Sequence, residues 1–164
     1  MQLEHMAEKL RLTDIGAIYS SDLKRSAIGA QIIARHHDVS IHVLPELREM
    51  YFGDWEGMTL AEVRENYPDK LEKREADVLH FEPPGGGESI ADLSKRILPC
   101  FQQIIEKQKG HDILIVGHGG VNRVILGHAL GLDLDRIFRI QQDYGCLNII
   151  DFFEDTTVVR LING

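Results

Sequence analysis

The sequence has little cysteine, no excess of positive charge and no long apolar run, and each absence narrows the class of protein. Its two cysteines, Cys100 and Cys146, are isolated in the chain, so we expect free thiols in a reducing cytoplasm, not a disulfide framework. A formal charge of -8 at pH 7 offers no basic face to nucleic acid or to an anionic membrane. A membrane span needs about 20 apolar residues, and no apolar run in the sequence approaches that length. The N-terminus has no signal-peptide pattern.

Histidine is present at eight positions, but not in a pattern typical of metal sites. His36, His37 and His42 fall near the end of one predicted helix and the start of a predicted strand, without the spacing of a zinc site. We therefore expect no metal ion and no organic cofactor. The negative overall charge still allows an anionic substrate, because a pocket can be locally positive.

Short apolar runs alternate along the chain with amphipathic helices, which predicts an α/β fold. The 164 residues suffice for one domain over 1–164, burying ~70% of the surface of the unfolded chain. We expect three layers, with a mostly parallel sheet and helices on both faces. Strands are predicted at 15–20, 41–44 and 113–116, an antiparallel pair at 146–152 and 158–162, and helices at 2–11, 23–33, 60–67, 69–81, 90–110 and 121–130.

A histidine flanked by glycines follows the most apolar of these runs. The four apolar residues 113–116 predict a strand buried on both faces, and a helical pattern starts at Val121. His118, between Gly117 and Gly119, therefore lies where a strand leads into a helix N-terminus, a place where α/β sheets bind ligands and anions find unpaired N–H groups. The alternative is a histidine packed into the turn for structural reasons.

Arg25 is predicted in the first turn of the helix that follows the strand 15–20. Either Ser21 or Asp22 can cap that helix. The helix dipole disfavours a cation in the first turn, which suggests that Arg25 has an anion to hold. A solvated surface arginine is the alternative that the sequence leaves open.

Residues 47–57 combine charged residues with large aromatics and follow neither regular period. This pattern predicts a loop that partly buries a carboxylate. Thr59 and Glu62 have the spacing of a capping box, and Ser89 is placed to cap the next long helix.

Five blocks of sequence resemble, in order, the histidine phosphatase superfamily, the phosphoglycerate mutase-like fold group. They are Ser20-Ser21-Asp22-Leu23-Lys24-Arg25, Leu47-Arg48-Glu49, Phe52-Gly53-Asp54-Trp55-Glu56-Gly57, Gly86-Gly87-Glu88-Ser89 and Val116-Gly117-His118-Gly119-Gly120. The resemblance covers essentially the whole chain. It is strongest to the α-ribazole phosphatases and broad small phosphatases, because the segment between Trp55 and Glu88 is short compared with that of the cofactor-dependent mutases.

The resemblance implies a role for each matching residue. Arg25 and the backbone N–H of Gly119 would bind the substrate phosphate, and Glu49 would protonate the leaving oxygen. His118, as an imidazolium, would stabilise the phosphoryl group during transfer. Such donors would counter the charge that phosphoryl transfer develops on the equatorial oxygens.

One block of the family pattern is missing: the sequence contains no Arg-His-Gly, which in the family supplies the nucleophilic histidine and a second arginine. Arg35-His36-His37 is the nearest imitation. We therefore expect an N-terminally truncated family member, with a late start at Met1 as one explanation. Family topology puts the absent strand between the strands 113–116 and 146–152. We therefore expect backbone groups without partners at this position, unless the remaining strands close the gap or a partner chain, such as a second copy, fills it.

We therefore expect a phosphomonoesterase acting on small phosphorylated molecules, with this chain impaired. His118 acting as nucleophile is one way around the missing block. The alternatives are a relative that binds phosphorylated ligands or free phosphate without turnover, a phosphoglycerate mutase-type activity, and a nucleotide-binding domain. The last is weakly signalled, because 117–120 matches no dinucleotide or phosphate-loop motif.

Overall fold

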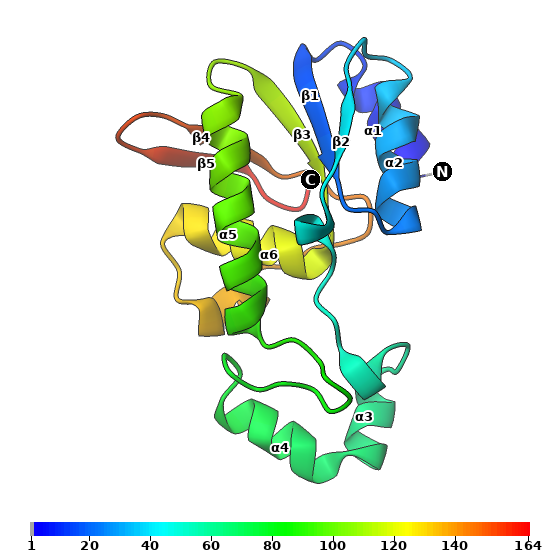
Figure 1. Ribbon diagram of the computed structural model, residues 1–164, viewed down its shortest axis with the longest axis vertical. Coiled ribbons are helices and arrows are strands. Elements are labelled where there is room, and N and C mark those ends of the chain that lie inside the picture. Colours follow the sequence, from blue (N-terminus) through cyan, green and yellow to red (C-terminus); the bar gives the residue numbers. More distant parts are fainter. Residues whose placement is uncertain (1) are drawn as a thin grey trace.

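The computed structural model describes residues 2–164, and its main sheet has three parallel strands in the order β2-β1-β3 (Figure 1). The strands are β1 Ile15–Ser20, β2 Ile41–Val43, β3 Asp112–Val116, β4 Ile149–Phe152 and β5 Thr157–Leu161, and the helices are α1 Gln2–Leu10, α2 Lys24–Ala34, α3 Leu60–Asn66, α4 Pro68–Ala76, α5 Ile90–Lys107 and α6 Gly119–Leu130. Met1, where we expected a late start, lies outside the described residues.

The predicted three layers are present, with a separate apolar core on each face of the sheet. Alternate residues of a strand point to opposite faces, so Ile18 of β1 packs among residues of α1 and α2 while Tyr19 packs among residues of α5 and α6. In β3, Leu114 and Ile115 divide in the same way. A third, smaller cluster of Trp55, Val63 and Leu71 lies apart from the sheet, around α3 and α4.

The sheet is open at β3. Strand β3 pairs with β1 along one edge, and no strand among residues 2–164 pairs with its other edge; β4 and β5 form a separate antiparallel sheet. A cavity of about 1280 Å³ includes the space between β3 and β4, lined there by Ile113, Ile115, Ile150 and Phe152. The gap between the predicted strands is therefore neither closed nor filled by the described chain.

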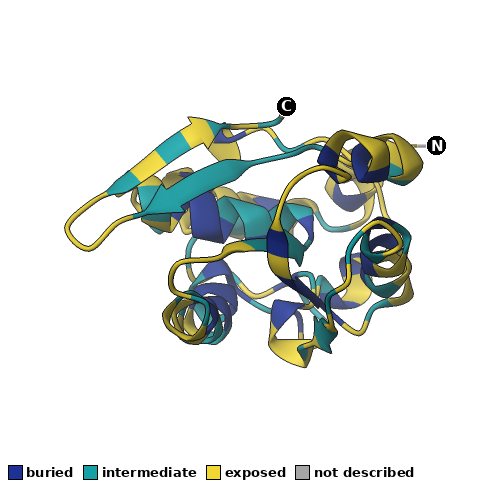
Figure 2. Cartoon of the chain, turned by 90° about the horizontal axis from the view of Figure 1, so that it is seen from above, coloured by how far each residue is buried: buried dark blue, intermediate teal, exposed yellow. Residues whose placement is uncertain are grey.

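The open edge corrects our prediction that residues 113–116 are buried on both faces. All four are only half-buried, because the cavity replaces a neighbouring strand. The hairpin of β4 and β5 likewise contains intermediate and exposed residues only (Figure 2).

Most predicted elements are confirmed, and the differences lie at their ends. The capping box of Thr59 and the cap by Ser89 are both present, whereas neither Ser21 nor Asp22 caps α2. Helix α4 ends at Ala76, not near residue 81. Both cysteines are free. Within residues 2–164, no helix combines the length and the apolar character needed to cross a bilayer.

Candidate active site

The carboxyl ends of β1 and β3 lie side by side and bring two short polar segments together. Ser20 is the register partner of Val116, so Ser21 and His118 follow the two strands at the same edge of the sheet. Both are removed from solvent: Ser21 is 0% exposed and His118 7%. The Ser21 Oγ lies 2.7 Å from the His118 Nε2.

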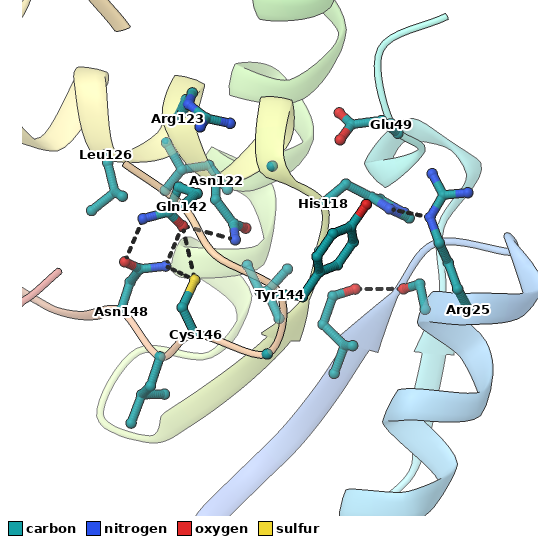
Figure 3. A pocket seen from close by; sticks show the side chains of 18 of the residues that line it. Arg25, Glu49, His118, Asn122, Arg123, Leu126, Gln142, Tyr144, Cys146 and Asn148 are labelled. Carbon is teal, nitrogen blue, oxygen red and sulfur yellow. Dashed lines mark hydrogen bonds between the residues drawn. The ribbon is translucent and has the colours of Figure 1, made fainter. Parts of the chain in front are cut away.

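The other ring nitrogen of His118 faces a guanidinium. Arg25, the second residue of α2, donates from Nε to the His118 Nδ1 at 3.2 Å (Figure 3). Burial, and then the positive charges of Arg25 and Arg96, lower the pKa of His118 from 6.5 to about 4. The ring is therefore neutral at pH 7 in the ligand-free site, and the imidazolium expected beside a phosphoryl group stays a prediction.

Glu49 reaches the same cavity from the loop after β2. Its carboxylate accepts hydrogen bonds from the backbone N–H of Gly120 (3.1 Å to Oε1) and from that of Met50 (2.9 Å). A Cβ on Gly120 would lie 2.5 Å from the Glu49 Oε1, so only glycine allows this approach. The expected half-buried carboxylate of the 47–57 loop is thus Glu49, held at the N-terminus of α6.

The loop that carries Glu49 is fixed by Arg96 of α5. Arg96 donates to the backbone carbonyl of Arg48 at 3.1 Å and pairs with Glu88 at 2.7 Å. Arg48 in turn forms a bidentate ion pair with Asp22, just before α2. These pairs connect the Glu49 loop to two helices of the site.

Arg123 is a further cation in the cavity and was not predicted. It donates from Nε to the carbonyl of Ile140 at 2.9 Å, which leaves its terminal nitrogens near Gly119; a Cβ on Gly119 would lie 3.0 Å from the Arg123 Nη1. Residues four apart share one face of a helix, so its spacing from Gly119 could have identified it.

A cluster of amides forms the opposite wall of the cavity. The side chains of Gln142 and Asn148 bond to each other at 2.7 and 2.9 Å, and Asn122 donates to Gln142 at 3.1 Å (Figure 3). Tyr144, 90% exposed, stands at the edge of this wall. Gln142, Tyr144 and Asn148 lie in the loop before β4, whereas Asn122 lies on α6. No local pattern in the sequence therefore brings these side chains together.

All four residues predicted to form the site, Arg25, Glu49, His118 and Gly119, line the cavity of about 1280 Å³. Arg35-His36-His37 does not: Arg35 and His36 pair with Glu4 and Glu8 of α1 on the outside of the molecule. The catalytic roles of the four residues remain predictions.

Comparisons with known proteins concern the family and the fold of the chain. The sequence model of the histidine phosphatase superfamily (branch 1) matches residues 1–164. The chain is 24% identical over 163 residues to the adenosylcobalamin/alpha-ribazole phosphatase of Escherichia coli, covering 99% of this chain and 80% of that protein. It is 35% identical over 130 residues to phosphoglycerate mutase-like protein 4 of Arabidopsis thaliana, covering 78% of this chain and 56% of that protein. Among solved structures, Bacillus stearothermophilus YhfR has a TM-score of 0.85 at 27% identity, covering 98% of this chain and 79% of that one.

Proposed function

This chain belongs to the histidine phosphatase superfamily, and from that premise we propose that it hydrolyses small phosphate monoesters. The observation that carries the proposal is the convergence of Arg25, Glu49 and His118, from three separate segments, on one cavity at the carboxyl end of a parallel sheet. This is the edge where open α/β sheets bind their ligands. The relatives of the chain include the adenosylcobalamin/alpha-ribazole phosphatase of Escherichia coli.

The phosphoryl group would lie among fixed donors. The terminal nitrogens of Arg25 and Arg123 and the backbone N–H of Gly119, at the N-terminus of α6, would bind its equatorial oxygens. Such donors stabilise a phosphoryl transition state because the charge develops on these oxygens. Glu49, once protonated, would supply the proton to the leaving oxygen.

We propose that turnover by the 164-residue chain is slow. His118 is the only histidine among residues 2–164 that lines the cavity, and both of its ring nitrogens are engaged, by Ser21 and by Arg25. A ring held in this way cannot attack phosphorus until one contact breaks. We further propose that the substrate range is broad or α-ribazole phosphatase-like and that the protein is cytoplasmic. A phosphoglycerate mutase-type activity is the alternative reaction.

The test is hydrolysis of 4-nitrophenyl phosphate by the purified chain. Arg25→Ala and His118→Ala should each lower the rate by about 10²-fold or more, as loss of comparable electrostatic donors does. Arg35→Ala and His36→Ala are matched controls on the outer surface and should keep the parent rate. Rapid turnover that depends on His118 would disprove slow turnover, and turnover independent of both site residues would disprove the site.

The engaged ring of His118 favours a second candidate, a module that binds phosphorylated ligands without turnover. This candidate predicts that inorganic phosphate raises the midpoint of thermal unfolding while 4-nitrophenyl phosphate is not hydrolysed. Stabilisation by nucleotides but not by simple phosphate esters would instead favour a nucleotide-binding domain.

The unpaired edges of β3 and β4 support a proposal about partners. We infer that a second copy of the chain covers the open edge, since exposed strand edges readily pair with another chain. Sedimentation should then give a dimer. A parent chain that sediments as a monomer at all concentrations would disprove the dimer.

A further inference from the structure

The ring of His118 has only one neutral tautomer that satisfies its two neighbours. A guanidinium can only donate, so the His118 Nδ1, 3.2 Å from the Arg25 Nε, must accept. The hydrogen of the neutral ring is therefore on Nε2, which donates to the Ser21 Oγ at 2.7 Å. The Arg25 contact thus determines the tautomer, and the Ser21 contact uses the hydrogen that results.

Ser21 is a rigid acceptor for this hydrogen. Its side chain is fully buried, its backbone N–H donates to the Ser26 Oγ at 3.2 Å, and its own Oγ also accepts from the backbone N–H of Leu23 at 3.3 Å. Both lone pairs of the Ser21 Oγ are therefore used, one by Leu23 and one by His118. Arg25, by contrast, is an exposed side chain that holds the ring from the cavity side.

We propose that Ser21 is a positioning residue that holds His118 through Nε2, and that an anion entering the site replaces Arg25 at Nδ1 while that nitrogen takes a proton from solvent. The inference rests on the proposed phosphate site and adds how that site responds to its ligand. A hydrogen on Nδ1 would point at the Nε–H of Arg25, so ring protonation and this contact exclude each other. An anion between the two groups accepts from both, and the Ser21 contact is the same before and after.

The charges around the ring favour this exchange. Arg25 on α2, Arg96 on α5 and Arg123 on α6 are the nearby cations, and Glu49, whose carboxylate lies near Gly119, is the facing anion. Burial, and then the charges of Arg25 and Arg96, lower the pKa of His118 to about 4 in the ligand-free site. A bound dianion offsets the cations and so raises the pKa of the ring.

Sulfate is a suitable probe, because it is a tetrahedral dianion that does not itself titrate between pH 5 and 8. We would titrate the 164-residue chain with sulfate and follow the histidine ring nitrogens by ¹⁵N NMR, with the His118 signals assigned through His118→Gln. We expect the Nε2–H tautomer without sulfate at pH 7 and a doubly protonated ring with it. As pH rises, sulfate affinity should fall about tenfold per pH unit wherever the free ring is neutral and the bound ring is charged.

Ser21→Ala tests the positioning role, and Ser20→Ala is its matched control. Ser20 is the neighbouring, fully buried serine, but its hydroxyl has no hydrogen-bond partner within the described part of the chain. Because the ring is then no longer held in place, we expect Ser21→Ala to weaken sulfate binding about 5- to 10-fold. We also expect it to shift the ¹⁵N signal of the His118 Nε2, which loses its acceptor, while Arg25 keeps the free ring in the Nε2–H tautomer. Ser20→Ala should change neither.

The outcomes separate this inference from the proposed function. Sulfate binding with a ring that stays neutral, or equal effects of Ser21→Ala and Ser20→Ala, would overturn the inference and leave the phosphate site intact. No sulfate binding at any pH would overturn the phosphate site itself. If Ser21→Ala does not fold, the tautomer and the pH dependence of sulfate affinity in the parent chain still decide the exchange.

Discussion

Strands β1 and β3 are neighbours in one sheet, yet they differ in how they are enclosed. Strand β1 is paired along both edges, and five of its six residues are buried. Strand β3 is paired along one edge within residues 2–164, and none of its five residues is buried. The two strands nevertheless end side by side, and Ser21 and His118 follow their ends.

The difference indicates that the two strands contribute differently. The apolar residues of β1 are removed from water and should supply most of the stability of the sheet. Those of β3 face a cavity, so their burial contributes less, while the end of β3 carries His118. The site therefore depends on a strand that is held mainly from one side.

The largest expected effect tests this contrast directly with one substitution in each strand. Ile18→Ala should cost about 4 kcal/mol, because Ile18 is 0% exposed and its loss leaves a cavity in packed surroundings. Ile115→Ala should cost about 1–2 kcal/mol, because that side chain is half-buried beside a cavity that already exists. Urea unfolding measures both values, and equal costs would show that the open edge is covered in solution.

The second expected effect concerns the ends of the strands and depends on pH. The pKa of His118 is about 4 in the folded chain, against an ordinary value of 6.5, so the unfolded chain takes up the proton first as pH falls. Above pH 6.5 the neutral ring therefore makes its full contribution to the free energy of unfolding. This contribution, about 3 kcal/mol at 1.36 kcal/mol per pKa unit, is lost as the pH falls from 6.5 to 4.

His118→Asn isolates this contribution, because it removes the titrating ring and leaves every other group that acid protonates. The stability of the parent chain, measured by urea unfolding from pH 7 to pH 4.5, should fall more steeply than that of the variant. Parallel curves for the two chains would show that the ring can be protonated in the folded site.

The sequence predicted the elements well because their signals are local. The capping box at Thr59 and the strand at 15–20 each follow from a few adjacent residues, and both are present. The ends of β1 and β3 could be placed together because parallel strands end at a common edge. The neutral state of His118 could not be predicted, since it depends first on the burial of the ring and then on the approach of Arg25 and Arg96 from two helices. Arg123 was missed, although its spacing of four residues from Gly119 places it on the same face of α6.

A third, smaller effect concerns the bond that ties the end of β3 to the helix after β1. The Ser26 Oγ donates to the carbonyl of Val116 at 2.5 Å and accepts from the N–H of Ser21 at 3.2 Å. Ser26→Ala leaves two buried backbone groups without partners and should cost about 1–2 kcal/mol. Ser40→Ala, at an exposed serine, is the control and should be close to neutral. A neutral Ser26→Ala would mean that β1 pairing alone holds the end of β3.

The smallest effect is expected away from both strands, in the cluster around α3. Thr59→Ala removes the capping box, in which the Thr59 hydroxyl accepts from the N–H of Glu62, and should cost about 1 kcal/mol. Thr13→Ala, at an exposed threonine outside any capping box, is the control. Trp55, the only tryptophan, lies in this cluster, so its fluorescence reports on α3 and α4 while circular dichroism reports on the whole chain.

If the cluster of Trp55, Val63 and Leu71 unfolds together with the sheet, the two signals should shift by the same amount in Thr59→Ala. Because the cluster shares few buried contacts with either face of the sheet, we expect the tryptophan signal to change first and sulfate binding to be retained. Coincident transitions would show that the α3 and α4 segment and the sheet form one cooperative unit. A destabilising substitution anywhere in the chain would then also destabilise β3, which is paired along one edge only and leads to His118.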